Sequence, residues 1–268
     1  MLELYQFEAS HYCEKIRLIL DYKQLPYRKI EVSPGVGQLD LFRLSGQRQV
    51  PVLKDGDEVV ADSTAIAFFL EKKYPERPIL PADPKHKGLC LMMEEWADES
   101  IGLNARKAMI GAFNQHPNFR TALLPSSTPD VLRNLLGSVP GDVLNLLGTG
   151  VGFGPEAVKT ATDALKQNLE ALCLLLQTGP YLVSDYPTLA DFAVAGLTMY
   201  IKFPASRYVD LPADVGDKGI PGLADDPAFQ SFFDWRDRLY ADYRKIRETP
   251  PPSSSNSSGS GPTPISID

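Results

Sequence analysis

Residues 2–32, LELYQFEASHYCEKIRLILDYKQLPYRKIEV, decide the fold class at the start of this chain. Apolar residues form a strand-like run over 2–7, recur at helical spacing over 12–24 and alternate with polar residues over 27–32. Pro26 ends the helix before the second strand begins. This order of strand, helix and strand predicts an α/β domain.

The next forty residues extend that domain. A weaker helical pattern covers 38–44, a hairpin with its turn at Asp55-Gly56 covers 51–60, and a third helical pattern covers 62–74. The resulting order, βαβ followed by α, ββ and α, predicts a compact domain around a small mixed sheet.

A proline-rich stretch separates this domain from a part that shows helical spacing alone. We therefore expect an α/β domain at 1–78, a linker at 79–84 and an all-helical domain at 85–248. Residues 117–155, rich in Leu, Gly and Pro, are expected to form an insertion in the helical domain. Residues 249–268 are mostly Pro, Ser and Gly, and we expect this tail to be disordered.

The composition limits the partners. The 268 residues include 27 Lys and Arg against 34 Asp and Glu, a formal net charge of −7. This balance argues against a nucleic-acid partner, because a phosphate backbone is bound by basic patches. No run reaches the roughly 18 apolar residues of a membrane-spanning helix. The chain start also lacks the features of a secretory signal.

Cysteine and histidine spacing limits the cofactors. The chain has three cysteines, widely spaced, which argues against a disulfide framework and indicates a reducing, cytoplasmic location. Its three histidines lack the spacing of metal ligands, so we expect no metal site.

Ser10-His11-Tyr12-Cys13 lies between the first strand and the first helix. A helix N-terminus offers unpaired N–H groups and a positive partial charge. A hydroxyl or thiol there can be stabilised as an anion, or can donate a hydrogen bond to an external thiolate. The structural alternative is that Ser10 only caps the helix.

Two further motifs have a ligand-binding and a structural interpretation. A cis bond at Val50-Pro51 would leave the backbone of Val50 free to pair with an extended ligand, whereas a trans proline would simply open a strand. Asp62-Ser63, at the start of the third helix, can receive an ammonium and a carboxylate or can cap the helix. A capping box at Thr188-x-x-Asp191 is structural in either case.

Together these motifs resemble the cytosolic glutathione transferase family, over about residues 1–110 and 156–247. The resemblance implies a thioredoxin-like glutathione-binding domain followed by a helical domain that forms the pocket for an electrophile. Ser10 matches the activating serine of the serine-type classes. The residues matched to glutathione are Val50-Pro51 for the cysteinyl part, Asp62 and Ser63 for the γ-glutamyl part, and Gln49 for the glycyl carboxylate.

Several residues near Ser10 leave alternatives open. Tyr5 and Tyr12 are rival hydroxyl donors, and His11 stands where many family members have proline. Cys13 occupies the position of the second cysteine of glutaredoxin-like motifs. Because Cys13 shares an apolar helix face with Ile16 and Leu20, we interpret it mainly as a packing residue.

Other side chains in the helices are assigned structural places. We expect Met92, Met93 and Trp96 to belong to the core. Arg17, Arg106 and Lys107 can line the cleft or be solvated, and we expect solvation, which is the usual state of such side chains.

The resemblance implies a cytoplasmic detoxification enzyme. It would conjugate the glutathione thiolate to small electrophiles, with peroxide reduction as a side activity, and would form a homodimer. Two alternatives remain at this stage. One is a non-catalytic binding or scaffold protein of the same fold, and the other is a thiol–disulfide oxidoreductase.

Overall fold

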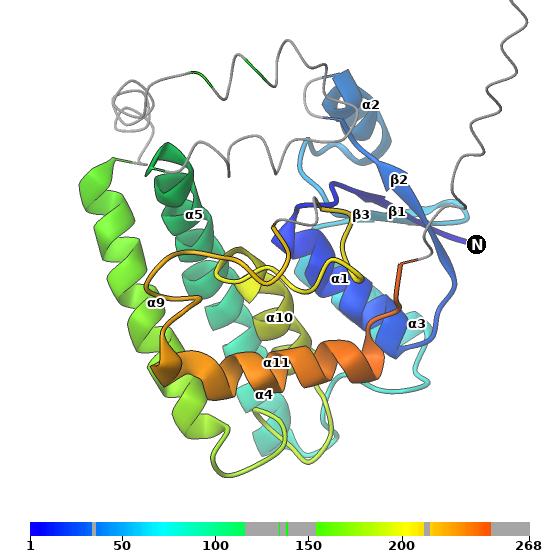
Figure 1. Cartoon of the computed structure of the whole chain (residues 1–268). Helices are drawn as coiled ribbons and strands as arrows, with labels where there is room; N and C mark the ends of the chain where they lie inside the picture. Colours follow the sequence, from blue (N-terminus) through cyan, green and yellow to red (C-terminus); the bar gives the residue numbers. More distant parts are fainter. Residues whose placement is uncertain (34–35, 116–133, 135–137, 139–153, 212–214, 248–268) are drawn as a thin grey trace, which may run out of the picture.

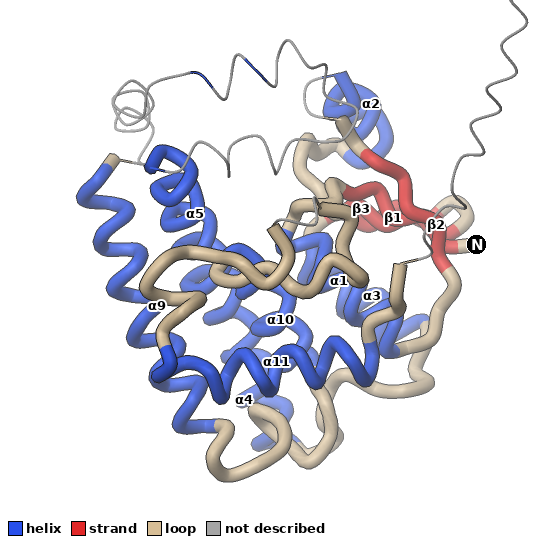
Figure 2. The backbone as a smooth tube through the Cα atoms, viewed as in Figure 1, coloured by secondary structure: helices blue, strands red, loops and turns tan. Residues whose placement is uncertain are grey.

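The computed structural model describes residues 1–33, 36–115, 134, 138, 154–211 and 215–247. Within these residues the strands gather on one side of the molecule, and helices α5 (Leu103–Gln115) and α9 (Pro155–Leu175) lie on the opposite side (Figure 2). The predicted tail at 249–268 and nearly all of the predicted insertion at 117–155 fall outside the described residues.

The N-terminal part is a four-stranded mixed sheet with three helices (Figure 1). The strand order is β2-β1-β3-β4, and only β1 and β2 run parallel. This thioredoxin-like arrangement confirms the predicted fold. The elements are β1 (Leu2–Gln6), α1 (His11–Tyr22), β2 (Tyr27–Glu31), α2 (Val36–Ser45), β3 (Val52–Asp55), β4 (Glu58–Ala61) and α3 (Ser63–Lys73).

The hairpin turn lies one residue later than predicted. Strand β3 ends at Asp55 and β4 begins at Glu58, so the turn consists of Gly56 and Asp57. Gly56 has a φ of 62°, a left-handed conformation that glycine adopts without steric cost.

The rest of the described chain is helical, as predicted. Apolar residues keep helical spacing over 86–113, but the helix there is interrupted by a π-helix, η1. The elements are α4 (Pro84–Trp96), η1 (Ala97–Gly102), α5 (Leu103–Gln115), α9 (Pro155–Leu175), α10 (Leu189–Leu197), two short 3₁₀ turns (Thr198–Tyr200 and Pro227–Phe229) and α11 (Gln230–Tyr243). In the described residues no helix is both long and apolar enough to cross a membrane.

The core joins the two parts through α1 and α10, which pack directly against each other. Phe192 and Val194 of α10 and Ile16 of α1 are fully buried in one continuous cluster. A Cβ atom on Gly196 would lie 2.6 Å from the backbone nitrogen of Lys15, so this close approach of the two helices requires glycine.

The predicted capping box at the start of α10 is present. Asp191 is fully buried, and its carboxylate accepts hydrogen bonds from the Thr188 N–H and hydroxyl and from the Leu182 N–H, each at 2.8 Å. The motif thereby fixes both the first turn of α10 and the loop before it.

The expectation that Arg17 is solvated was wrong. Arg17 is fully buried, donates to Gln6 at 2.6 Å and pairs with Glu14. Arg244, just after α11, pairs with Glu14 at 2.9 Å and Asp21 at 2.6 Å. Buried charges need such partners, and here the partners connect α1 to the end of α11.

The expectation of a core position was wrong for Met92, whose side chain is 71% exposed. Met93 and Trp96 are partly buried against the core. The buried residues of α4 are Cys90 and Glu94, so the helix presents a different face to the interior than its apolar residues suggested.

Candidate active site

A cavity of about 620 Å³ opens where the start of α1, the turn before β3, the start of α3 and the η1–α5 segment meet. All six residues that the sequence analysis selected line it: Ser10, Gln49, Val50, Pro51, Asp62 and Ser63. The structure therefore brings together residues that lie more than fifty positions apart in the chain. Their roles toward a ligand remain predictions.

Ser10 caps α1 with an extended backbone, and its hydroxyl oxygen accepts a hydrogen bond from the Cys13 N–H at 3.3 Å. The capping interpretation is thus correct. The Ser10 hydroxyl also forms a hydrogen bond with the Cys13 thiol, and it donates to no oxygen or nitrogen atom of a described residue. A thiolate in the cavity, being charged, would compete with the neutral Cys13 sulfur for this proton.

The rival groups near Ser10 are less suited to activating a thiol. Tyr12 lines the cavity, but its hydroxyl donates to the backbone carbonyl of Asp98 at 3.1 Å. Tyr5 lies outside the residues that line the cavity and donates to Glu3 at 3.4 Å. Cys13 is fully buried, and burial raises the pKa of its thiol to about 11. The interpretation of Cys13 as a packing residue is confirmed.

The π-helix η1 holds the first residues of α1 in place. Nε2 of His11 lies 3.1 Å from the carbonyl oxygen of Gly102, which can only accept, so Nε2 carries the proton. Burial lowers the pKa of His11 to about 3 and keeps the ring neutral. A Cβ on Gly102 would lie 2.7 Å from the Tyr12 hydroxyl, so a side chain at this position would displace the Tyr12 ring.

The Val50–Pro51 peptide bond is cis, as the sequence analysis suggested. Strand β3 begins its pairing with β1 at Val52, which lies opposite Tyr5. The N–H and carbonyl of Val50 make no hydrogen bond to any described residue. An extended chain lying in the cavity can therefore pair with the Val50 backbone.

Asp62 caps α3, and its carboxylate accepts from the N–H groups of Thr64 and Ala65 at 3.0 Å each. Its φ of 79° is unusual for a residue other than glycine, and such conformations cluster at functional sites. Ser63 follows at the first position of the helix and is 3% exposed. The helix N-terminus at Ser63 thus faces the cavity and can receive an anion.

A buried ion-pair network that the sequence analysis missed lies behind Ser63. Lys15 of α1 is fully buried, and its Nζ atom lies 2.5 Å from Glu94, 2.9 Å from Asp98 and 3.3 Å from the Ser63 hydroxyl. Burial raises the pKa of Asp98, and the positive charge of Lys15 opposes that shift. One cation faces two carboxylates, so the network retains negative charge at Asp98, on the wall of the cavity.

No local signal identified this network, because its residues come from two different parts of the chain. Another signal that sequence reasoning missed is η1 itself, since helical spacing continues through it. In the parts of the chain that the structure describes, no group of three or more His, Cys, Asp or Glu is placed to hold a metal ion.

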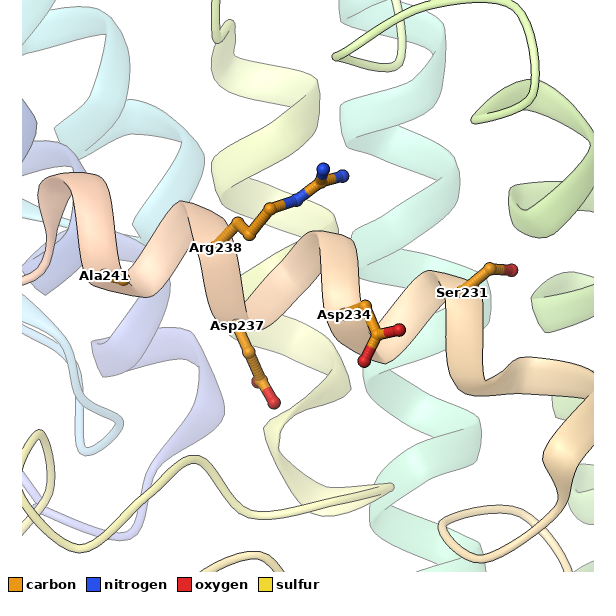
Figure 3. Close-up of a pocket in the computed structure, with 5 residues that line it drawn as sticks. All are labelled: Ser231, Asp234, Asp237, Arg238 and Ala241. Atoms are coloured by element: carbon orange, nitrogen blue, oxygen red, sulfur yellow. The ribbon is translucent and has the colours of Figure 1, made fainter.

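A second pocket lies on the outer face of α11 (Figure 3). It is lined by Ser231, Asp234, Asp237, Arg238 and Ala241, which all belong to that one helix. None of the residues selected from the sequence lies there, so the cavity at Ser10 is the candidate active site.

A thioredoxin-like domain whose cis-proline turn and helix N-termini face a helical domain defines the glutathione transferase class of proteins. Residues 4–78 match the family model for the glutathione S-transferase N-terminal domain. The chain is 30% identical over 195 residues to a zeta-class glutathione S-transferase of Euphorbia esula, covering 71% of either chain. It therefore belongs to the glutathione S-transferase family.

Two further comparisons agree. The chain is 30% identical over 193 residues to a maleylpyruvate isomerase of a Ralstonia species, covering 71% of this chain and 77% of that one. A glutathione S-transferase structure from Rhodospirillum rubrum superposes with a TM-score of 0.61 at 18% identity, covering 90% of this chain and 88% of that one. The relatives support a glutathione-dependent transferase or isomerase, and the structure supports the fold.

Proposed function

We propose that this enzyme conjugates the thiolate of glutathione to small electrophiles and that Ser10 activates the thiol. One observation carries the proposal. Of Ser10, Tyr5, Tyr12 and Cys13, only Ser10 both lines the cavity and keeps a hydroxyl proton free of described oxygen and nitrogen acceptors.

The γ-glutamyl end of glutathione fits the start of α3. Its carboxylate would face the Ser63 hydroxyl and the helix N-terminus, with the charge of Lys15 behind them. Its ammonium would face Asp98, where the buried network retains negative charge. Asp62 supports this end by holding the first turn of α3 in position.

The remaining parts of glutathione extend along the turn before β3. The cysteinyl residue would pair with the free N–H and carbonyl of Val50, beside the cis-Pro51 ring. The glycyl carboxylate would reach Gln49 and the neighbouring Arg48, which both line the cavity. This placement directs the thiol toward Ser10.

The chemistry follows from the ionisation of the thiol. A free thiol has a pKa near 8.5, so only a few per cent is thiolate at neutral pH. The Ser10 O–H would donate to the sulfur and favour the charged form, helped by the positive end of α1. The thiol proton leaves to solvent, and the sulfur attacks the electrophilic carbon. Ser10 acts as a hydrogen-bond donor and not as a covalent nucleophile.

The thiol–disulfide oxidoreductase alternative is disfavoured. Such an enzyme needs a reactive thiolate, and the candidate, Cys13, is fully buried with a pKa raised to about 11. A second candidate function is glutathione-dependent isomerisation, favoured by the similarity to the Ralstonia isomerase. In that reaction the thiolate would add to the substrate and leave again. Peroxide reduction remains a prediction.

We further propose that two copies associate through the exposed apolar face of α4. Met92 and Leu89 are 71% and 43% exposed, and with Trp96 they give this helix an apolar surface. Sedimentation that shows only monomer at micromolar concentration would overturn this assignment. The cytoplasmic location also remains a prediction.

Calorimetric titration with glutathione tests the assignment of the site. Ser63→Ala is expected to weaken binding by about tenfold, because a hydrogen bond to a charged group is lost. Ser231→Ala, an exposed serine on α11, is the matched control and is expected to bind normally. If the wild-type protein fails to bind millimolar glutathione, the transferase proposal falls and a scaffold role takes its place.

A further inference from the structure

The helical wall of the cavity holds two hydrogen-bond donors that the protein itself leaves unused. This wall consists of His11, Tyr12, Leu103, Arg106 and Tyr200. His11 and Tyr12 direct their protons to backbone carbonyls of η1. Arg106 and Tyr200 make no hydrogen bond to any described residue.

Arg106 lies on α5, and its guanidinium shares no ion pair with a described residue. Its positive charge lowers the pKa of His11, as burial does. It also opposes the rise that burial causes in the pKa values of Tyr12 and Tyr200. Arg106 lines the same cavity as these three rings. Arg106 is exposed, as expected, and it also lines the cavity, the other placement that the sequence leaves open.

Tyr200 lies at the end of the 3₁₀ turn after α10, and its ring stacks on His11 with centroids 4.2 Å apart. Burial raises its pKa, so the phenol keeps its proton at neutral pH. Tyr200 is partly buried, and its hydroxyl makes no hydrogen bond to a described residue. Since this oxygen is not fully buried, it remains accessible from the cavity. Tyr200 is thus a neutral donor in the same cavity as the Arg106 cation.

None of the acidic residues that line the described cavity forms an ion pair with Arg106. Asp98 is bound to Lys15, and His11 is neutral. Glu99 lines the cavity and also a neighbouring groove on α4, is exposed, and shares no ion pair with Arg106. Arg48, the other cation among the described lining residues, belongs to the opposite wall, at the turn before β3.

We propose that Arg106 and Tyr200 bind a carboxylate of the second substrate, so that the enzyme prefers anionic electrophiles to neutral ones of the same shape. The assignment rests on the proposed transferase function and adds the substrate class. A guanidinium with a neighbouring hydroxyl donor matches the two oxygens of a carboxylate. The rings of His11, Tyr12 and Tyr200 form an apolar surface against which the body of an aromatic substrate can stack.

A matched pair of chromogenic substrates tests the preference: 4-chloro-3-nitrobenzoate and 4-chloro-3-nitrobenzamide. They have nearly the same shape and differ in charge. In both, the glutathione sulfur forms a bond to the ring carbon that carries chlorine. The carbon–chlorine bond then breaks, chloride leaves with the electron pair, and the thiol proton passes to solvent.

The measured quantity is kcat/KM for each substrate. Arg106→Gln is expected to lower the value for the benzoate by about tenfold or more and the value for the benzamide by less than about threefold. Arg106→Lys keeps the positive charge, and its kcat/KM for the benzoate is expected to lie between those of the wild type and Arg106→Gln. Tyr200→Phe is expected to weaken the benzoate reaction selectively, by about threefold. Lys107→Gln, the next residue on α5, removes the same charge outside the lining residues and is the control.

The outcomes separate this inference from the proposed function. If Arg106→Gln lowers both rates equally, or lowers neither, Arg106 does not bind the carboxylate and the inference is wrong, while the transferase assignment stands. If Lys107→Gln lowers kcat/KM for the benzoate as much as Arg106→Gln does, the effect comes from the net charge of the protein and the inference is again wrong. If the wild-type enzyme turns over neither substrate, the proposed function itself is in question.

Discussion

Replacing Ser10 tests the mechanism most directly, because the structure separates its two roles. As a helix cap, the Ser10 oxygen accepts from the Cys13 N–H at 3.3 Å. As an activating group, its proton would be donated to the glutathione sulfur. A hydrogen bond to an ionised group contributes about 1.5–3 kcal/mol, which corresponds to about one to two pKa units.

The expected size of the effect follows from this shift. A thiol with its ordinary pKa near 8.5 is about 3% thiolate at pH 7. Lowering the pKa of the thiol by about one to two units raises that fraction to roughly 25–75%. In Ser10→Ala we therefore expect the pKa of bound glutathione to rise by about one to two units and the thiolate fraction at pH 7 to fall by about 8- to 25-fold.

Ultraviolet difference absorbance of bound thiolate against pH measures this shift, and the inflection of kcat/KM with pH should move with it. The difference in kcat/KM between the wild type and Ser10→Ala should disappear as the pH approaches about 9.5, because most of the thiol is ionised there even without the hydrogen bond. Ser10→Thr keeps the hydroxyl and should restore the lower pKa, and Cys13→Ser should leave the bound thiol unchanged. A thiol pKa that stays the same in Ser10→Ala would refute the assignment of Ser10 as the donor.

Three further changes test the packing around the site. Asp191→Ala removes the acceptor of three buried donors and should lower the free energy of unfolding by about 3–5 kcal/mol in urea denaturation. Burial raises the pKa of Glu8, but two basic neighbours outweigh it and lower it to about 2. Glu8 therefore stabilises the fold above about pH 4.5, and this contribution of about 3 kcal/mol is lost as the pH falls toward 2. In Glu8→Gln the free energy of unfolding should therefore fall less between about pH 4.5 and 2 than in the wild type. An unchanged pH dependence would contradict the ion pairing of Glu8. Gly102→Ala should displace Tyr12 and reduce activity at a cost of about 1–3 kcal/mol in stability, whereas Gly88→Ala, which meets open space on α4, should be neutral or stabilising. Equal effects of the two alanines would show that the contact at Gly102 is unimportant.

The features that the sequence predicts correctly are local. Alternation and helical spacing locate the strands and helices to within a few residues, because burial on one face follows the period of each element. The Thr188–Asp191 capping box and the Val50–Pro51 turn are likewise short patterns, in which a few neighbouring residues determine the conformation. Their order along the chain was sufficient to identify the family.

The features that the sequence analysis missed depend on contacts between distant segments. Arg17 looks like a surface residue in the sequence, and it is buried because Glu14 and Arg244, 230 positions apart, share one ion-pair network with it. Lys15 is buried for the same reason, since Glu94 and Asp98 come from the helical part. A charged side chain can be buried when the fold brings oppositely charged partners next to it. Residue spacing within one helix does not reveal partners from distant segments.

The π-helix η1 shows how such contacts bear on substrate choice. Such segments are rare and often occur at functional sites. Here the carbonyls of Asp98 and Gly102 accept the protons of Tyr12 and His11 and so remove these side chains from the set of donors that a ligand can use. Apart from the donors proposed to bind the peptide part of glutathione, the cavity still offers Ser10 at the proposed sulfur position and Arg106 with Tyr200 on the helical wall. A neutral hydroxyl can lower the pKa of a thiol, while a cation with a hydroxyl donor in the same wall can favour an anionic substrate. The division of donors between backbone and cavity therefore separates the group that we propose to activate glutathione from the groups that we propose to select the second substrate.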